Sequence, residues 1–120
     1  MPLVSAMKKI LVLVLTLLGI QGAAFSADTP SKVVFLTGDE EYRSEESQSM
    51  LAKMLERDYG FETVVGFSVD EDGFVDPLAA ESLTMTEELA DADLLVMYLR
   101  FRRPSEAAFQ HILEYLGKGK

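Results

Sequence analysis

KVVFLT, residues Lys32 to Thr37, is an unbroken apolar run rich in β-branched and aromatic residues, and it ends at Gly38. A strand that is buried on both faces carries such a continuous run, whereas a half-exposed strand alternates apolar with polar residues. The run therefore predicts the central strand of a parallel sheet.

The next segment has the pattern of an amphipathic helix over residues 45–59, with Ser44 as its N-cap and Gly60 as a left-handed C-cap. Its apolar residues recur at helical spacing, and we expect them to face the sheet: Met50, Leu51, Met54 and Leu55. Residues 61–67 (FETVVGF) follow as a second strand. This strand is less uniformly apolar than the first, which favours a position nearer the sheet edge.

The alternation continues to the end of the chain. Thr84, with Glu87 three residues later, has the form of a capping box and predicts a short helix over residues 85–90. Residues 94–99 (LLVMYL) are the third strand, and Pro104 marks the first turn of a last helix. That helix carries one apolar stripe, with a histidine on its opposite, exposed side: Phe109, Ile112, Leu113 and Leu116, with His111 opposite.

Strands that alternate with helices predict a parallel sheet, because parallel neighbours need a crossover connection and such crossovers are right-handed. We expect a three-layer α/β sandwich over residues 28–120, with the strand order 2-1-3. The sequence ends directly after the last helix, where this architecture ordinarily enters another strand. We therefore expect the N-terminal half of a larger domain, with an open edge at the third strand through which a homo-oligomer could form.

Composition excludes several classes of function. The 120 residues carry 11 Lys and Arg against 20 Asp and Glu, and a net charge of −9 opposes binding to nucleic acid. The chain has no Cys, which excludes disulfides, thiolate metal sites and a cysteine nucleophile, and its single His excludes a His-rich metal cluster. Gly38 is the only glycine of the first loop, so neither a dinucleotide fingerprint nor a P-loop is present. We expect no cofactor.

The first 27 residues have the three-part layout of a secretory signal peptide. Lys8 and Lys9 precede the apolar run Ile10–Ile20, and a tail of small residues follows it. A membrane-spanning helix needs about 20 apolar residues, and this run reaches about half that length. We expect cleavage and a periplasmic or secreted protein with no stable membrane anchor; an uncleaved anchor is the alternative.

Two loops of opposite charge follow the first and third strands. Ligands of an open parallel sheet bind beyond the carboxyl ends of the strands, where the winding direction reverses, so 38–47 (GDEEYRSEES) and 100–104 (RFRRP) mark the expected site. Arginines just before a helix are disfavoured by its macrodipole and need another explanation. The candidate residues are Gly38, Asp39, Glu40, Glu41, Tyr42, Arg43, Arg100, Phe101 and Arg102.

Two interpretations of these loops stay open. In the first, the arginines form ion pairs with the acidic loop, each worth about 0.2–1 kcal/mol when exposed. In the second, arginines, carboxylates and aromatic rings together grip a polyhydroxylated or anionic ligand. Metal binding is disfavoured, because three adjacent acids diverge and residues 68–73 (SVDEDG) lack the acid that a calcium loop needs. No catalytic residue is assigned, since no serine has a nearby histidine.

The segments VVFLTGDEEYRSEES, MLAKMLERDYGFETVVGFSVDEDGFVDP and ADADLLVMYLRFRRPSE, within residues 32–120, resemble the ThuA-like (trehalose-utilisation-like) family, above all its exported members. The resemblance implies a flavodoxin-like fold of the class I glutamine amidotransferase type and a role in sugar metabolism. Relatives continue past the last helix into a further strand and a loop containing Thr, His and aromatic residues, which this sequence lacks.

Three functions follow in order of preference. The first is a partial ThuA-like domain whose two loops bind a carbohydrate or related polyol. The second is a noncatalytic periplasmic binding or interaction module that pairs through its open third strand. The third, a hydrolase or amidotransferase, is least favoured because a glutaminase triad needs a cysteine.

Overall fold

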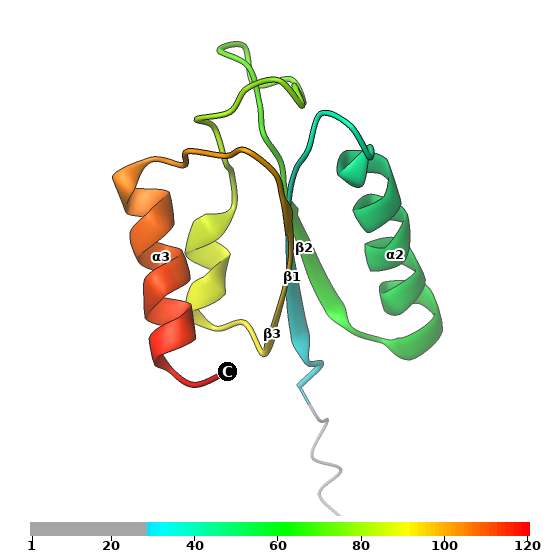
Figure 1. Ribbon diagram of the computed structural model, residues 1–120. Helices are drawn as coiled ribbons and strands as arrows, with labels where there is room; N and C mark the ends of the chain where they lie inside the picture. Colours follow the sequence, from blue (N-terminus) through cyan, green and yellow to red (C-terminus); the bar gives the residue numbers. More distant parts are fainter. Residues whose placement is uncertain (1–28) are drawn as a thin grey trace, which may run out of the picture.

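Three parallel strands form one sheet that has helices on both faces (Figure 1). The computed structural model describes residues 29–120, and the expected signal peptide, residues 1–27, lies outside the described residues. In chain order the elements are β1 (Lys32–Gly38), α2 (Ser44–Tyr59), β2 (Glu62–Gly66), the 3₁₀ helix η1 (Thr86–Ala90), β3 (Leu94–Leu99) and α3 (Glu106–Gly117). The predicted α/β class is confirmed.

The strand order is β2-β1-β3, with β1 parallel to both neighbours, as the sequence predicted. Every residue of β1 is buried. β2 and β3, which form the two edges of the described sheet, are only partly buried. A continuous apolar strand therefore occupies the one position where both faces and both edges are covered.

The alternating side chains of β1 divide the core into two layers. One layer lies between the sheet and α3 with η1, and it comprises Val34, Leu36, Leu89, Ala92, Ile112 and Tyr115. The other lies between the sheet and α2, and it comprises Val33, Phe35 and Ala52. The side-chain period of two in a strand explains why β1 serves both layers.

Helix α2 differs from the prediction at its start and on its buried face. Arg43, with a left-handed φ of 53°, precedes the helix, and no side chain caps it. Ser44 is instead buried without a hydrogen-bond partner for its Oγ. Met50 and Met54 are 63% and 43% exposed, because the smaller Ala52 occupies the position against the sheet. Leu51 is exposed as well, whereas the C-cap at Gly60 (φ 71°) is confirmed.

The second half of the chain departs from the prediction at its helix termini. Thr84 does not cap η1; its hydroxyl bonds the backbone of Phe67, and Met85, with φ 59°, precedes the 3₁₀ turn. Ser105 is the N-cap of α3, which begins at Glu106, because its Oγ accepts a hydrogen bond from the amide of Ala108; Pro104 therefore lies before the helix and not in its first turn.

The apolar stripe of α3 is also narrower than the sequence indicated. Ile112 is buried, but Phe109, Leu113 and Leu116 are between 43% and 53% exposed. His111 was expected on the surface and is instead partly buried, with its Nδ1 3.0 Å from Thr86 Oγ1. Compared with the prediction, α3 is turned about its axis: the side with His111 meets η1, and the side with Phe109, Leu113 and Leu116 faces outward.

Residues 67–85 form an irregular segment over the carboxyl ends of the strands (the green loops at the top of Figure 1). An antiparallel bridge between Val69 and Val75 closes its first part. The amide of Thr84 donates to the carbonyl of Phe67 over 2.9 Å and returns the chain to the sheet. Between residues 29 and 120, no helix is both long and apolar enough to cross a membrane.

Candidate functional site

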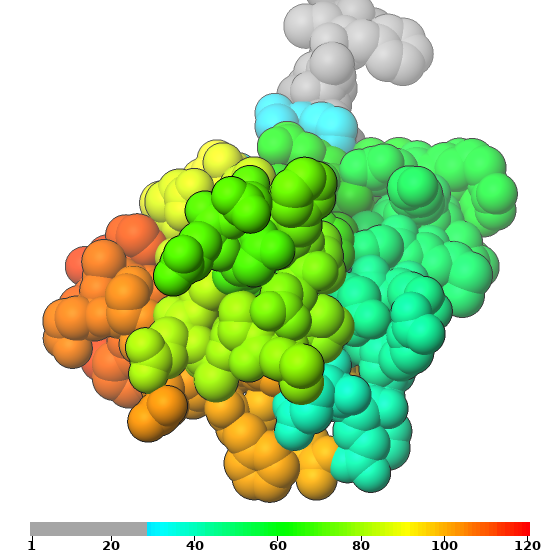
Figure 2. Space-filling view, turned by 90° about the horizontal axis from the view of Figure 1, so that it is seen from above, coloured from blue at the N-terminus to red at the C-terminus, as the bar shows by residue number. Residues whose placement is uncertain are grey.

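The two loops of opposite charge lie against each other at the carboxyl end of β1. The amide of Arg100 donates to the carbonyl of Gly38 over 2.9 Å, so backbone hydrogen bonding joins the loops where the strands end. Figure 2 shows the segments near residue 40 (teal) and near residue 100 (orange) beside each other at one edge of this end of the molecule. The predicted juxtaposition of the loops is confirmed.

Arg102 fastens three segments together from a buried position. Its side chain is 4% exposed; its Nε donates to the carbonyls of Gly38 (2.8 Å) and Arg100 (2.9 Å). Its Nη2 donates to the carbonyl of Pro77 (2.6 Å) and to Glu40 Oε2 (2.8 Å). Its Nε and Nη2 are thus occupied by the protein, so Arg102 holds the loops in place, whereas its Nη1 is buried without a hydrogen-bond partner.

Gly38 allows this close approach. A β-carbon at Gly38 would lie 2.9 Å from Ser68 Oγ and 3.0 Å from Arg102 Cδ, which is tighter than normal contact. The glycine therefore lets the start of the 67–85 segment and the arginine side chain pack directly on the end of β1.

Arg100 is held by one carboxylate and two aromatic rings. It forms an ion pair with Glu41, which largely offsets its charge. Its Cζ lies 5.7 Å from the ring centroid of Tyr42 and 4.7 Å from that of Phe101, both within cation–π range. Phe101 adopts a left-handed φ of 52° and is 75% exposed. A positive φ in a bulky residue is a strained conformation that often marks a functional loop.

An open hollow of about 330 Å³ lies between the loops and the end of β3. Tyr42 and Tyr98 meet edge to face on it, with ring centroids 6.4 Å apart and planes at 78°. Its lining residues are Asp39, Tyr42, Met97, Tyr98, Leu99 and Arg100. The hollow, named here the aromatic hollow, therefore combines apolar ring surface with a carboxylate and a guanidinium.

Asp39 is the buried carboxylate of this hollow. The residue is 1% exposed, and its Oδ1 accepts hydrogen bonds from the amides of Glu41 (2.5 Å) and Tyr42 (2.9 Å). These bonds form an Asx turn that fixes the acidic loop. Its Oδ2 has no hydrogen-bond partner. A buried carboxylate oxygen without a partner costs free energy, which a donor from a ligand or a water molecule would recover.

Arg43 and Glu40 lie on a different surface from the aromatic hollow. They line a second hollow of about 460 Å³, together with Asp39, Glu45, Glu46, Val75 and Pro77. Arg43 forms ion pairs there with Glu46 and, more loosely at 3.4 Å, with Glu45. Asp39 is the wall between the two hollows. The candidate residues therefore divide into an aromatic group around Arg100 and an acidic group around Arg43, with Asp39 in both hollows, while Gly38 and Arg102 join the loops.

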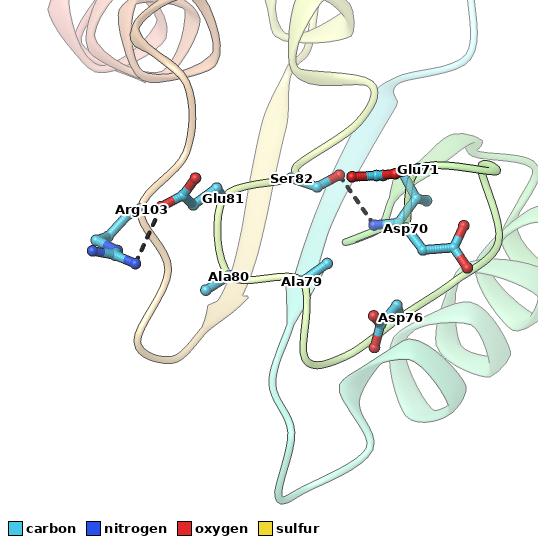
Figure 3. Close-up of a pocket in the computed structure, with 9 residues that line it drawn as sticks. Asp70, Glu71, Asp76, Ala79, Ala80, Glu81, Ser82 and Arg103 are labelled. Atoms are coloured by element: carbon cyan, nitrogen blue, oxygen red, sulfur yellow. Dashed lines mark hydrogen bonds and ion pairs between the residues drawn. The ribbon is translucent and has the colours of Figure 1, made fainter.

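A third hollow, of about 550 Å³, lies in the 67–85 segment next to Arg103 (Figure 3). Its carboxylates serve the segment itself. Asp70 Oδ1 accepts from the amides of Asp72 and Phe74, and Asp76 Oδ1 accepts from that of Leu78. Arg103 pairs with Glu81 at 3.1 Å and not with the acidic loop that was its predicted partner. The Oδ1 atoms of Asp70 and Asp76 thus close turns within the segment.

Sequence reasoning missed the contributions of β3 and of the 67–85 segment. Tyr98 and Met97 of β3 line the aromatic hollow. Pro77 lies in the irregular 67–85 segment, and its carbonyl accepts a hydrogen bond from Arg102. Tyr98 could have been found, because it lies one residue before the end of a strand that ends at the site. Pro77 offered no such signal.

Within the described residues, the two loops hold neither a metal-ligand cluster nor a histidine. Among residues 29–120, no group of three or more His, Asp or Glu side chains is placed to hold a metal ion. The only histidine of the sequence bonds Thr86 at η1. Acid–base chemistry at the loops would therefore depend on carboxylates and tyrosine hydroxyls and not on an imidazole.

Comparison with known proteins adds no relative: no family model, no curated protein and no solved structure matches this chain. The resemblance to ThuA-like proteins stays an expectation from the motif residues.

Proposed function

We propose that this chain is an exported ThuA-like domain, the N-terminal half of a flavodoxin-like sheet of the class I glutamine amidotransferase type. Its function is to bind a carbohydrate or related polyol at the carboxyl ends of its strands, in the use of trehalose-type sugars. The periplasm or the exterior is its place of action. The aromatic hollow is the observation that carries the proposal.

The chemistry of the hollow suits a sugar. Tyr42 and Tyr98 offer ring faces and edges to the apolar C–H surface of a pyranose, and Tyr hydroxyls can exchange hydrogen bonds with it. Asp39 Oδ2 is a buried acceptor without a partner beside the hollow, and Arg100 is a multiple donor. Apolar walls with a few convergent polar groups are the usual composition of a small-molecule site.

The charge balance of the hollow favours a neutral sugar. Arg100 is already paired with Glu41, and Asp39 adds a further negative charge beside it. A phosphorylated sugar would bring a dianion next to these carboxylates, and like charges in close approach are disfavoured. We therefore expect trehalose or glucose to bind more tightly than glucose 6-phosphate.

Titration calorimetry with trehalose, glucose and glucose 6-phosphate tests this function. Tyr42→Ala removes one wall of the hollow and should weaken the binding of trehalose about tenfold, which corresponds to about 1.4 kcal/mol. Tyr59→Ala is the matched control, because Tyr59 is an exposed tyrosine (73%, against 60% for Tyr42) at the far end of α2. Absence of binding by both neutral sugars, or equal losses in the two variants, would refute a sugar site in this hollow.

A further inference from the structure

The second hollow, named here the acidic hollow, carries an excess of negative charge. Most of its lining comes from the acidic loop and the first turn of α2, and Val75 and Pro77 of the 67–85 segment complete it. The charged residues of the lining are four carboxylates and one guanidinium: Asp39, Glu40, Glu45, Glu46 and Arg43. Even when Arg102 is included, which pairs with Glu40 from a buried position, four negative charges meet only two positive ones.

Two carboxylate oxygens of the acidic hollow lack a hydrogen-bond partner. Asp39 is 1% exposed, and its Oδ2 accepts no hydrogen bond. Glu45 Oε2 is likewise buried without a partner, and Glu45 Oε1 reaches Arg43 only at 3.4 Å. An ionised carboxylate accepts hydrogen bonds and donates none, so the two side chains cannot satisfy each other. What the hollow lacks is therefore a donor.

The N-terminus of α2 explains only part of this arrangement. Glu45 and Glu46 stand in the first turn of the helix, where the positive end of its macrodipole favours acids. Asp39 precedes the helix, and the dipole does not explain why its Oδ2 is buried away from every donor, because such an oxygen costs free energy. A buried side chain outside the helix therefore points, independently of the helix, to a missing donor in the same hollow.

An ammonium group fits the hollow better than a metal ion or a hydroxyl. Hard metal ions need several oxygen ligands that converge at about 2.0–2.6 Å, and among residues 29–120 no three acidic or histidine side chains are placed to supply them. A neutral hydroxyl would satisfy one oxygen and leave the negative charge unmatched. A primary ammonium brings a positive charge and three N–H donors, which bond carboxylate oxygens at about 2.7–2.9 Å.

We propose that the acidic hollow binds the primary ammonium group of a small-molecule ligand, between the carboxylates of Asp39 and Glu45. Because Asp39 also lines the aromatic hollow, a sugar ring beside the tyrosines would hold an amino substituent next to this carboxylate. The ligand class that fits both hollows is an amino sugar. This last step rests on the proposed sugar function, whereas the ammonium site itself does not.

Arg43 is the group that the ammonium would displace. Its side chain is 66% exposed, and it pairs with Glu46 and more loosely with Glu45. Movement of this side chain into water uncovers Glu45 at little cost, since exposed ion pairs contribute little to stability. The ligand and Arg43 therefore compete for the same carboxylate.

Titration calorimetry with glucosamine, N-acetylglucosamine and glucose, at a pH where the amine is protonated, tests the ammonium site. The three sugars share a ring, but only glucosamine carries a positive charge. Glucosamine should bind at least about tenfold more tightly than either neutral sugar, which corresponds to about 1.4 kcal/mol. Glucosamine that binds no more tightly than both would overturn the proposal. If glucose or trehalose still binds in that case, the sugar function stands without the ammonium site.

Two variants of the acidic hollow should shift the affinity for glucosamine in opposite directions. Glu45→Gln keeps the size of the side chain and removes a charge, so the affinity should fall about tenfold while that for glucose is unchanged. Arg43→Gln removes the competing cation, so the affinity should rise by about two- to fivefold. Glu114→Gln is the matched control, because it makes the same charge change on an exposed residue of α3, across the sheet from α2, and it should alter neither affinity.

Circular dichroism of each variant verifies the fold, and Arg43→Gln keeps the test decisive if Glu45→Gln does not fold. Equal losses in Glu45→Gln and Glu114→Gln would overturn the proposal, and so would an unchanged or lower affinity in Arg43→Gln. Glucosamine binding that depends on Glu45 but not on Tyr42, with no binding of glucose or trehalose, would support the ammonium site and refute the sugar function.

Discussion

The Nε of Arg102 donates a hydrogen bond to the carbonyl oxygen of Gly38 over 2.8 Å, which ties the loop after β3 to the last residue of β1. The same guanidinium reaches Pro77 and Glu40. One buried arginine thus fixes three loop segments that have no regular structure of their own. The aromatic hollow lies beside this junction and depends on it for its shape. The contribution of the junction can be measured as a change in the free energy of unfolding.

Arg102→Ala should lower the free energy of unfolding by about 2–4 kcal/mol, because it removes the donor to the partly buried carbonyl oxygens of Arg100 and Pro77 and one of the two donors to that of Gly38. Urea unfolding followed by circular dichroism measures the loss. Arg103→Ala is the control: Arg103 is 78% exposed and bonds Glu81 on the surface, so its loss should be within about 0.5 kcal/mol. Similar losses in the two variants would show that Arg102 does not join the loops.

Gly38→Ala should also be destabilising, by about 1–3 kcal/mol, since its β-carbon would displace Ser68 and Arg102. Thermal unfolding provides the measurement. Gly117→Ala is the matched control, because a β-carbon there meets no atom within 4 Å and α3 ends at that residue. The control should be neutral or slightly stabilising. A neutral Gly38→Ala variant would mean that the two loops do not pack as closely as described.

Lys32 lies at the opposite end of β1 and supplies a pH dependence. Its Nζ is 2.6 Å from both Asp91 Oδ1 and Glu88 Oε2, and these hydrogen bonds, Asp91 first, raise the pKa of Lys32 above its ordinary 10.5. The bond from Lys32 lowers the pKa of Asp91 below its ordinary 3.8.

The raised pKa of Lys32 adds stability that is complete below pH 10.5 and is lost as the pH rises through the folded pKa. The lowered pKa of Asp91 adds stability that is complete above pH 3.8 and is lost as the pH falls through its folded pKa. The difference in unfolding free energy between wild type and Lys32→Met should therefore be constant near neutrality and shrink in acid and in strong alkali. Urea titrations across pH measure this difference. If the difference in unfolding free energy stayed constant as the pH falls below 3.8, the result would contradict the prediction.

The sheet was predictable from the sequence because burial on both faces leaves a direct signature in β1. Its parallel neighbours follow from the alternation of strands and helices, and the approach of Gly38 to Arg100 follows from the strand order. The faces of the helices were harder to predict. The face that packs is chosen by size and position: Ala52 reaches the sheet where Met50 and Met54 do not.

Site residues were predictable where they follow a strand and not where they come from elsewhere. Asp39 and Arg100 come directly after the ends of β1 and β3. Pro77 contributes a backbone carbonyl, which every residue has, so no residue type indicated it. The division of the candidates between two hollows follows from the Asx turn at Asp39 and the left-handed backbone of Arg43, two local conformations that the sequence pattern had not indicated.

Helix capping gives a last comparison between expectation and structure. Ser105 Oγ accepts a hydrogen bond from the amide of Ala108 and caps α3, whereas Ser44 Oγ is buried with no partner. Ser105→Ala should therefore cost about 1 kcal/mol, while Ser44→Ala should be neutral or stabilising because it removes an unpaired buried hydroxyl. Chemical unfolding of both variants decides the point. If Ser44→Ala costs as much as Ser105→Ala, then Ser44 caps α2 in solution, and the left-handed Arg43 is not what begins the helix.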